Sequence, residues 1–232
     1  MSKSAKPAVI MQKKEQLWGF VYLLAEIFLL PAALQALSQS LPDPLPSSWL
    51  NFLYFALNFI FTCFLFRDFL KQSLIQAGKN TEDFLLVTFS GFGIYYLANM
   101  ALSFAIRMIA PDFANLNDGS ISQQMQGNFF IMALGTSLLV PVAEELLHRG
   151  LVFGSLYRKS RWFAFVFSSA LFSAIHILGY IGVYSLPHLL IAFVQYLPAG
   201  LILAWAYRKS GSIFSPILIH AAVNTLALAS LR

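Results

Sequence analysis

Charged side chains are scarce in this chain of 232 residues, since Asp, Glu, Lys and Arg together make up only 11% of it. An ordinary soluble domain carries about 25% of these residues, most of them on its surface. Hydrophobic residues account for 58% of the chain. Too little charge is left to cover a soluble globule of this size, so the composition excludes an ordinary soluble enzyme and favours a membrane protein.

Cysteine is almost absent, because Cys63 is the single one. A single cysteine excludes an internal disulfide, and neither a Cys-x-x-Cys pair nor a Cys/His zinc-knuckle spacing is present. Cys63 lies within a hydrophobic run, and we interpret it as a packed, inert thiol. The sequence also lacks the His-Glu-x-x-His pattern of many zinc peptidases.

Three long stretches contain no charged residue: 84–106, 119–143 and 162–207. Crossing a bilayer takes about 20 residues of helix, so the last stretch is long enough for two passes. The predicted fold is an all-α, polytopic transmembrane bundle of about seven spans, or six to eight if a segment is re-entrant. The predicted spans are 17–37, 49–66, 84–106, 129–157, 162–180, 187–207 and 213–231.

The domain organisation predicted from these spans is a single membrane domain. Residues 1–16 form a basic cytoplasmic tail that we expect to be mobile up to residue 14, and residues 17–231 form the transmembrane domain, with a catalytic core at 129–231. The first apolar run is longer than the core of about 7–15 residues found in a signal peptide, which favours a retained first span. The polar segments 38–48, 67–83 and 108–128 are predicted as loops.

The basic residues explain the net charge of +5 without a nucleic-acid partner. Lysine and arginine cluster at 3–14, 67–79, 158–161 and 208–209, whereas the alternate loops contain aspartates. This alternation follows the positive-inside rule and predicts a cytoplasmic N-terminus and, with seven spans, an external C-terminus. No organelle-targeting signal is recognised, which favours a multi-pass protein of a bacterial plasma membrane.

Four ionisable residues gather in Glu144-Glu145-Leu-Leu-His148-Arg149, directly after twenty-five uncharged positions. Each charge costs roughly 2.5–3.5 kcal/mol within a span. Residues four apart share a helix face, so Glu145 is predicted to pair with Arg149, while Glu144 points elsewhere, toward His148 or a partner helix. We assign Glu144 as the working carboxylate. The reverse assignment stays open, as does the interpretation that the helix simply leaves the membrane here.

Two further histidines and an asparagine lie in apolar spans. His176 is fifteen residues after the turn at Arg158–Arg161 and Glu144 is fourteen before it, so both fall at one depth, about 20 Å from the turn at 1.5 Å per residue. His220 and Asn224 are four apart and share a face, but His220 is predicted to lie about two helical turns shallower. His188, at an external end, is interpreted as structural, and Glu26 is left unassigned.

Three motifs follow one another in order: Glu-Glu-x-x-x-Arg at 144–149, Phe-x-x-x-His at 172–176 and His-x-x-x-Asn at 220–224. Together they resemble the CAAX protease and bacteriocin-processing (CPBP, or Abi) family of intramembrane proteases, to which the Ras-converting CAAX prenyl endopeptidase is related. The resemblance implies an all-helical core with a cavity open to the cytoplasmic side, and peptide-bond hydrolysis by an activated water.

The resemblance also implies a role for each motif residue. Glu144 is the general base, His176 orients the water, and His220 with Asn224 stabilises the oxyanion. Glu145 and Arg149 support the architecture. The expected substrate is a membrane-associated peptide or protein, with or without a lipid anchor.

The need for a metal stays open from the sequence. Two histidines and a glutamate also suit a catalytic zinc ion, and the residues that would hold it are Glu144, His176 and His220. No cofactor is favoured, because Asn224 is a better oxyanion donor than metal ligand.

Two other functions remain as alternatives. One is a non-catalytic family member acting in bacteriocin immunity or as a membrane scaffold. The other is a small proton-coupled transporter, in which buried Glu and His residues relay protons. Transporters often show paired repeats and broken helices, and no such repeat is found here.

Overall fold

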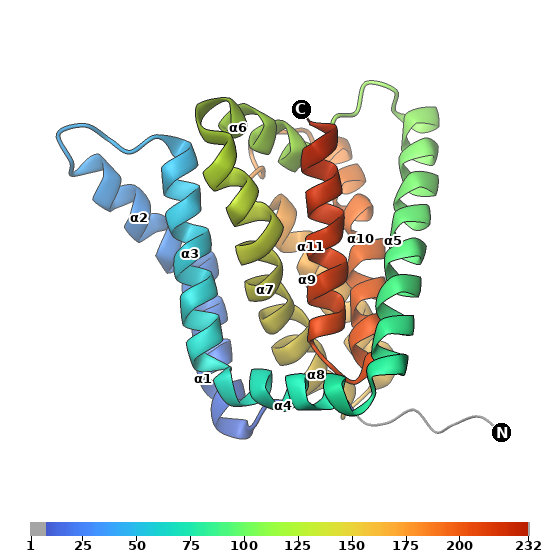
Figure 1. The fold of residues 1–232 in the computed structure, drawn as a ribbon. Helices are drawn as coiled ribbons and strands as arrows, with labels where there is room; N and C mark the ends of the chain where they lie inside the picture. The colour runs from blue at the N-terminus through green and yellow to red at the C-terminus, as the bar shows by residue number, and fades with distance from the viewer. Residues whose placement is uncertain (1–7, 232) are drawn as a thin grey trace.

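The computed structural model describes residues 8–231, which are almost entirely helical and contain no β-strand. Hydrophobic helices stand side by side in a bundle (Figure 1). Six of them are long and apolar enough to cross a membrane, and the helix Phe214–Ser230 (α11) is apolar but shorter. The predicted all-α polytopic bundle is confirmed.

The spanning helices follow the predicted order, and several contain a wider π-helical segment. The first span joins Lys13–Leu24 (α1), the π-helical Ala25–Leu29 (η1) and Leu30–Gln39 (α2). The next two are Ser47–Leu65 (α3) and Thr81–Ile109 (α5). The fourth joins Leu116–Leu134 (α6), Gly135–Leu139 (η2), Val140–Glu145 (α7), Leu146–Phe153 (η3) and Gly154–Tyr157 (α8). Arg161–Leu178 (α9), Leu186–Ser210 (α10) and α11 complete the bundle.

The polar segment 67–83 differs from its prediction as a loop, because Arg67–Lys79 form a helix (α4). Phe69, Ser73 and Ala77 recur every four residues and are buried on one face, while Leu74 is exposed. Figure 1 shows α4 lying across the end of the bundle rather than along it. The low mean hydropathy of this segment favoured a loop. In the structure it is an amphipathic helix, and its apolar face packs against the ends of the spans.

The described part of the N-terminal tail is packed against the same end, which differs from the expected mobile tail. The backbone N–H of Val9 donates to the carbonyl of Gly211 at 3.2 Å, and Met11 is buried. The buried carboxylate of Glu15 accepts from the backbone N–H of Phe69 at 3.0 Å, in the first turn of α4. This carboxylate therefore caps α4. Residues 1–7, with Lys3 and Lys6, lie outside the described residues.

Most of the basic residues collect at this end of the molecule, where α4, α8 and the α10–α11 turn meet (Figure 1). The opposite end holds the loop at 40–46, the start of α6 and the C-terminal end of α11. Arg107 is exposed near the C-terminal end of α5, at this second end of the bundle. It is an exception to the predicted alternation of basic and acidic loops. We call these the basic end and the opposite end of the bundle.

A close helix crossing joins α9 to α10 at Gly200. A Cβ atom at this position would come within 2.5 Å of the Cβ of Ser169 and 2.6 Å of its Cα. Such a contact forces the two backbones apart, and overpacking of this kind costs about 1–3 kcal/mol. Glycine at 200 thus sets the spacing of two helices that both reach the candidate site.

We expect Gly200→Ala to lower the midpoint of thermal unfolding in detergent, measured by circular dichroism. Gly93→Ala in α5 is the matched control, because nothing lies within 4 Å of its added Cβ and alanine favours a helix by about 1 kcal/mol over glycine. An equal midpoint for the two variants would contradict the tight α9–α10 crossing.

Candidate active site

A cavity of about 660 Å³ lies among the spanning helices, in the half of the bundle toward the opposite end. Its walls come from η1, from the first halves of α3 and α10, from the fourth span between Met132 and His148, and from the last parts of α5, α9 and α11. All four residues assigned to catalysis line it: Glu144, His176, His220 and Asn224. The structure therefore brings together side chains from three helices that are far apart in sequence.

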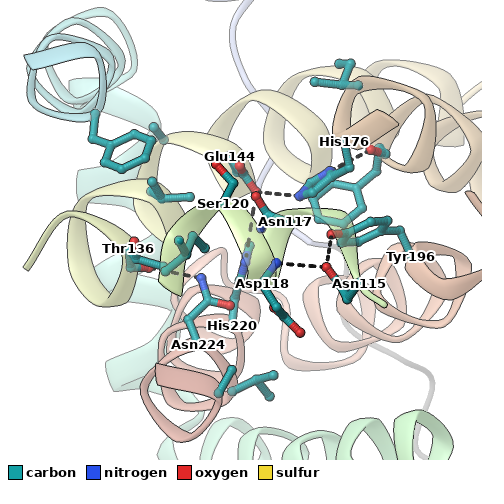
Figure 2. A pocket seen from close by; sticks show the side chains of 18 of the residues that line it. Asn115, Asn117, Asp118, Ser120, Thr136, Glu144, His176, Tyr196, His220 and Asn224 are labelled. Atoms are coloured by element: carbon teal, nitrogen blue, oxygen red, sulfur yellow. Dashed lines mark hydrogen bonds and ion pairs between the residues drawn. The ribbon is translucent and has the colours of Figure 1, made fainter. Parts of the chain in front are cut away.

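Glu144 faces both histidines (Figure 2). Its Oε2 atom lies 3.9 Å from Nε2 of His176 and 3.9 Å from Nε2 of His220. These distances exceed those of a hydrogen bond, so the carboxylate faces both imidazoles without a direct bond to either. The Glu144 side chain lines the cavity and is 27% exposed, whereas its Oε2 atom is itself buried and has no hydrogen-bond partner in the described chain.

In both His176 and His220 the second ring nitrogen, Nδ1, lies within hydrogen-bond distance of an oxygen atom. Nδ1 of His176 lies 2.8 Å from the carbonyl oxygen of Phe172, which only accepts, so this Nδ1 carries the hydrogen. Nδ1 of His220 lies 2.8 Å from Oε1 of Glu145. Both rings thus turn Nε2 toward Glu144, and the tautomer of each is set by its partner.

Glu145 and Arg149 form the predicted buried pair, with 2.9 Å between Nη1 and Oε1 and both side chains fully buried. Nη2 of Arg149 also donates to the carbonyl of Ala199 at 3.2 Å. Because Oε1 of Glu145 also accepts from His220, the pair links α7, α10 and α11. The supporting role is therefore to hold His220 in place as well as to neutralise charge.

Phe172 lies at the centre of these polar groups. Its ring centroid is 4.2 Å from the guanidinium carbon of Arg149, 4.3 Å from the ring of His176 and 6.2 Å from that of His220. A guanidinium over an aromatic face is attracted to the ring and needs no further polar partner there. Phe172 thereby separates the buried cation from the cavity, a role the motif alone did not reveal.

Asn224 lies on the cavity wall one turn beyond His220. Its Nδ2 donates one hydrogen to the carbonyl of Thr136 at 2.9 Å, and the same amide nitrogen carries a second hydrogen. Figure 2 shows this bond on the wall across from His176. The bond fixes the orientation of this amide on the wall of the cavity that Glu144 also lines.

His220 reaches the depth of Glu144, although counting residues from the interhelical turns placed it about two helical turns shallower. The turn before α11 is buried: Ser212 and Ile213 have no exposed surface, and the Ser212 hydroxyl donates to the carbonyl of Ser73 in α4 at 2.8 Å. The turn at 158–161 is exposed instead. Helix α4 covers the turn before α11 but not the turn at 158–161. Depths counted in residues from these two turns are therefore not comparable.

The remaining histidines occupy different places. His148 lines the cavity, is 3% exposed, and its Nδ1 has no hydrogen-bond partner among the described residues. His188 lies near the opposite end, with its ring 4.6 Å from Phe113 and 5.1 Å from Tyr184. It does not line the cavity, in agreement with its structural interpretation.

The roof of the cavity is the part of the chain that was predicted as the external loop 108–128. A helix begins at Leu116, capped by the Asn115 side chain, which accepts from the backbone N–H of Asp118 at 3.0 Å. The backbone of Asn128 is non-helical (φ −163°, ψ 90°) and separates this roof helix from the predicted span. The polar composition suited a loop, and only the tertiary structure shows a helix that covers the site.

Polar side chains on the roof and upper walls were missed by the sequence argument. Asn51 of α3 donates to Gln124 of the roof helix at 2.6 Å, and Asn115 donates to Gln195 of α10 at 3.0 Å. Tyr196, next to Gln195, stacks on His176 with 4.3 Å between ring centroids. The roof is thus bonded to two walls, one of which supports His176.

The donor atoms of the site can be compared with the ligands that a zinc ion requires. A histidine ligand usually donates its second ring hydrogen to a carbonyl or carboxylate, and His176 and His220 both do so. Zinc with bonds of about 2.0–2.1 Å needs donors about 3.3 Å apart, so separations of 3.9 Å would have to close by about 0.6 Å. Among the described residues no preformed metal cluster of three such ligands exists. The donor types fit zinc, but their present spacing is wide.

The buried pair predicts a large difference between single and double substitutions. Arg149→Met leaves the Glu145 carboxylate buried without its cation, which costs about 3–5 kcal/mol. Adding Glu145→Gln removes that charge and is expected to restore part of the loss. Thermal unfolding in detergent measures both variants, and a double variant less stable than Arg149→Met would contradict the pairing.

Among the comparisons with known proteins, the family match falls on the part of the chain that holds the four residues assigned to catalysis. Residues 126–226 match the family model "Type II CAAX prenyl endopeptidase Rce1-like". The UPF0177 protein YxdF of Lactococcus lactis is 34% identical over 87 residues, which cover 38% of this chain and 42% of the relative. The "Putative membrane peptidase YdiL" of Bacillus subtilis is 31% identical over 99 residues, which cover 42% and 36%.

The match thus spans about two fifths of the length of these curated relatives. No solved structure matches the chain significantly. The matched segment includes Glu144, His176, His220 and Asn224, so the resemblance predicted from the three motifs is confirmed. Residues 126–226 of this chain therefore resemble the Rce1-like family of type II CAAX prenyl endopeptidases.

Proposed function

We propose that this protein is an intramembrane endopeptidase that hydrolyses a peptide bond of a membrane-associated protein or peptide. The observation that carries the proposal is the convergence of the Glu144 carboxylate with Nε2 of His176 and Nε2 of His220 in one polar cavity. The family match and the relative named as a membrane peptidase support the same class of activity.

Glu144 acts as the general base in this proposal. A water molecule between Glu144 and His176 donates one hydrogen to the carboxylate and the other to Nε2 of His176, whose Nδ1 hydrogen is held by the Phe172 carbonyl. Its lone pair is then free to attack the scissile carbonyl. Glu144 takes the proton and passes it to the leaving amine, which is the usual sequence for a positioned base.

Asn224 and His220 stabilise the oxyanion of the tetrahedral intermediate. Asn224 uses the amide hydrogen that Thr136 does not take. His220 already donates from Nδ1 to Glu145, so it donates to the oxyanion only in its doubly protonated form. Fixed donors of this kind are most effective where water is scarce.

The position of the cavity bears on the side from which the substrate comes. The resemblance implies a cavity open to the cytoplasmic side, whereas this cavity lies in the half of the bundle away from the basic end. If the basic end faces the cytoplasm, as the positive-inside rule predicts, the two expectations exclude each other. We propose the charge-based orientation, with a substrate bond in the extracytoplasmic half of the membrane.

Substituting the base tests the proposal. Purified protein in detergent is expected to cleave a peptide joined to a membrane-embedded segment, and Glu144→Gln is expected to lower the rate by about 10²–10⁴-fold. Mass spectrometry identifies the products. Asp43→Asn, at an exposed site outside the cavity, is the control. Normal cleavage by Glu144→Gln would overturn the mechanism, and a carrier or scaffold would show no cleavage at all.

We propose catalysis without a metal ion, with the Glu144 carboxylate as sufficient base. If zinc were bound, Glu144, His176 and His220 would hold it, and it would supply a more acidic water. Elemental analysis of purified protein distinguishes the two cases. We expect less than stoichiometric zinc in the native chain and no difference in Glu144→Ala or His176→Ala. One zinc per chain that disappears in both variants would contradict the proposal.

A further inference from the structure

The second half of the chain carries a group of cations at the basic end, although no aspartate or glutamate occurs in the sequence after Glu145. These cations lie in the α8–α9 turn, at the start of α9 and in the last turn of α10, and we call them the basic cluster: Arg158, Lys159, Arg161, Arg208 and Lys209. Arg158, Lys159 and Arg161 form no ion pair with a carboxylate in residues 8–231. The described chain therefore does not neutralise their charge by direct contact.

Tyr157 brings two members of the cluster together from different helices. The guanidinium carbon of Arg208, at the end of α10, lies 5.2 Å from its ring centroid, and that of Arg161, at the start of α9, lies 6.0 Å from it. The ring is itself packed against Phe153, with 5.2 Å between centroids. An aromatic face attracts each guanidinium, but the two like charges repel each other. An anion bound beside them would remove this repulsion.

The positive-inside rule explains why cations lie at this end of the bundle, but it does not explain why two of them meet. Membrane orientation depends on the number of lysines and arginines in a loop and not on contacts among them. Arg67, at the same end, has a local arrangement instead: its guanidinium carbon lies 5.5 Å from the ring of Phe64, three residues before it. The meeting at Tyr157 joins residues about fifty positions apart and is a property of the tertiary structure.

A second, smaller cavity of about 90 Å³ adjoins the cluster. Tyr157 and Arg208 line it together with apolar side chains, which include Phe153 and Ile10 of the N-terminal tail. Tyr157 and Arg208 thus belong both to the meeting point of the cations and to a largely apolar cavity. A site with positive charge on one side and apolar walls on the other suits an amphiphile.

Apolar surface suited to acyl chains begins next to the cluster on α9. Trp162, Phe163 and Val166 are 84%, 52% and 63% exposed, and the first two directly follow Arg161. Helix α9 is long and apolar enough to cross a membrane, and an exposed tryptophan at the end of a span is typical of the membrane interface. A lipid whose anionic group contacts Arg161 therefore finds apolar protein surface beside its chains.

We propose that the basic cluster binds the headgroup of an anionic phospholipid, with its phosphate held by Arg161 and Arg208 beside Tyr157 and its acyl chains along α9. Guanidinium groups bind phosphate through paired, charge-assisted hydrogen bonds. Basic side chains near an anionic membrane surface also strengthen its binding. This site lies at the basic end, away from the cavity that holds Glu144, and the inference does not depend on the proposed function.

The test compares two lipids with the same acyl chains, anionic phosphatidylglycerol and net-neutral phosphatidylcholine. Native mass spectrometry of the purified protein in a neutral detergent gives the dissociation constant of each. We expect the native chain to bind phosphatidylglycerol about tenfold more tightly. Arg161→Gln with Arg208→Gln is expected to remove most of this preference. A native chain without the preference, or a double variant that keeps it, would overturn the inference.

Lys71→Gln with Lys79→Gln is the matched control. Both lysines are exposed on α4 at the same end of the bundle, so this variant loses the same charge without touching the cluster. It is expected to keep the preference of the native chain for phosphatidylglycerol. An equal loss in the two double variants would indicate a diffuse attraction to net charge and would contradict a site at Tyr157.

Tyr157 allows a second test at constant charge. Tyr157→Leu removes the ring on which the two guanidinium groups meet and is expected to weaken the preference, whereas Tyr157→Phe keeps the ring and is expected to retain it. Equal preferences for Tyr157→Leu and the native chain would contradict the role of the ring. If circular dichroism shows that Tyr157→Leu is unfolded, the two double variants decide the inference.

Inorganic phosphate distinguishes a lipid site from a site for a free anion. An excess of phosphate, added at constant ionic strength, is expected to leave phosphatidylglycerol bound, because free phosphate lacks the apolar contacts with α9. Loss of the bound lipid to the extent seen in Arg161→Gln with Arg208→Gln would indicate a site for free phosphate and would overturn the assignment to a lipid.

Discussion

The buried ion pair between Glu145 and Arg149 is the interaction on which the site depends. Neither charge is stable alone within a membrane, and each has a second partner: Glu145 accepts from His220, and Arg149 donates to the Ala199 carbonyl and lies over Phe172. The pair therefore joins α7, α9, α10 and α11 around one point. Because breaking one half exposes an unpaired buried charge, the arrangement has little freedom to shift.

The geometry around Glu144 follows from this constraint. His220 is held by Glu145, and His176 is held by the Phe172 carbonyl and by stacking on Tyr196. Each histidine is therefore fixed through atoms that do not face the cavity, so that Nε2 stays directed at Glu144. Tyr196 in turn adjoins Gln195, which binds the N-cap of the roof helix. The roof is thus linked through Gln195 and Tyr196 to His176 on the wall of the cavity.

The roof also gives the site its chemical character. A cavity closed by hydrocarbon side chains would suit a lipid chain, whereas this one is covered by asparagine, aspartate, serine and glutamine side chains. Polar groups facing inward in a membrane mark the path of a polar ligand. In our proposal the cavity therefore receives the peptide part of the substrate, and any lipid anchor stays outside it.

The sequence by itself determined the bundle, its approximate spans and the Glu145–Arg149 pair, because hydrophobic length and i, i+4 spacing are local properties, and it predicted four residues that line one cavity. It did not predict α4, the roof helix or the packed tail, since polar segments form helices there only through contacts with distant spans. The depth of His220 likewise depends on α4 covering its turn, and the contacts of Glu26, Phe172 and Thr136 are made with residues from other parts of the chain. Which side chains share one cavity was decided by the packing of the helices, because local spacing contains no information on how separate helices face one another.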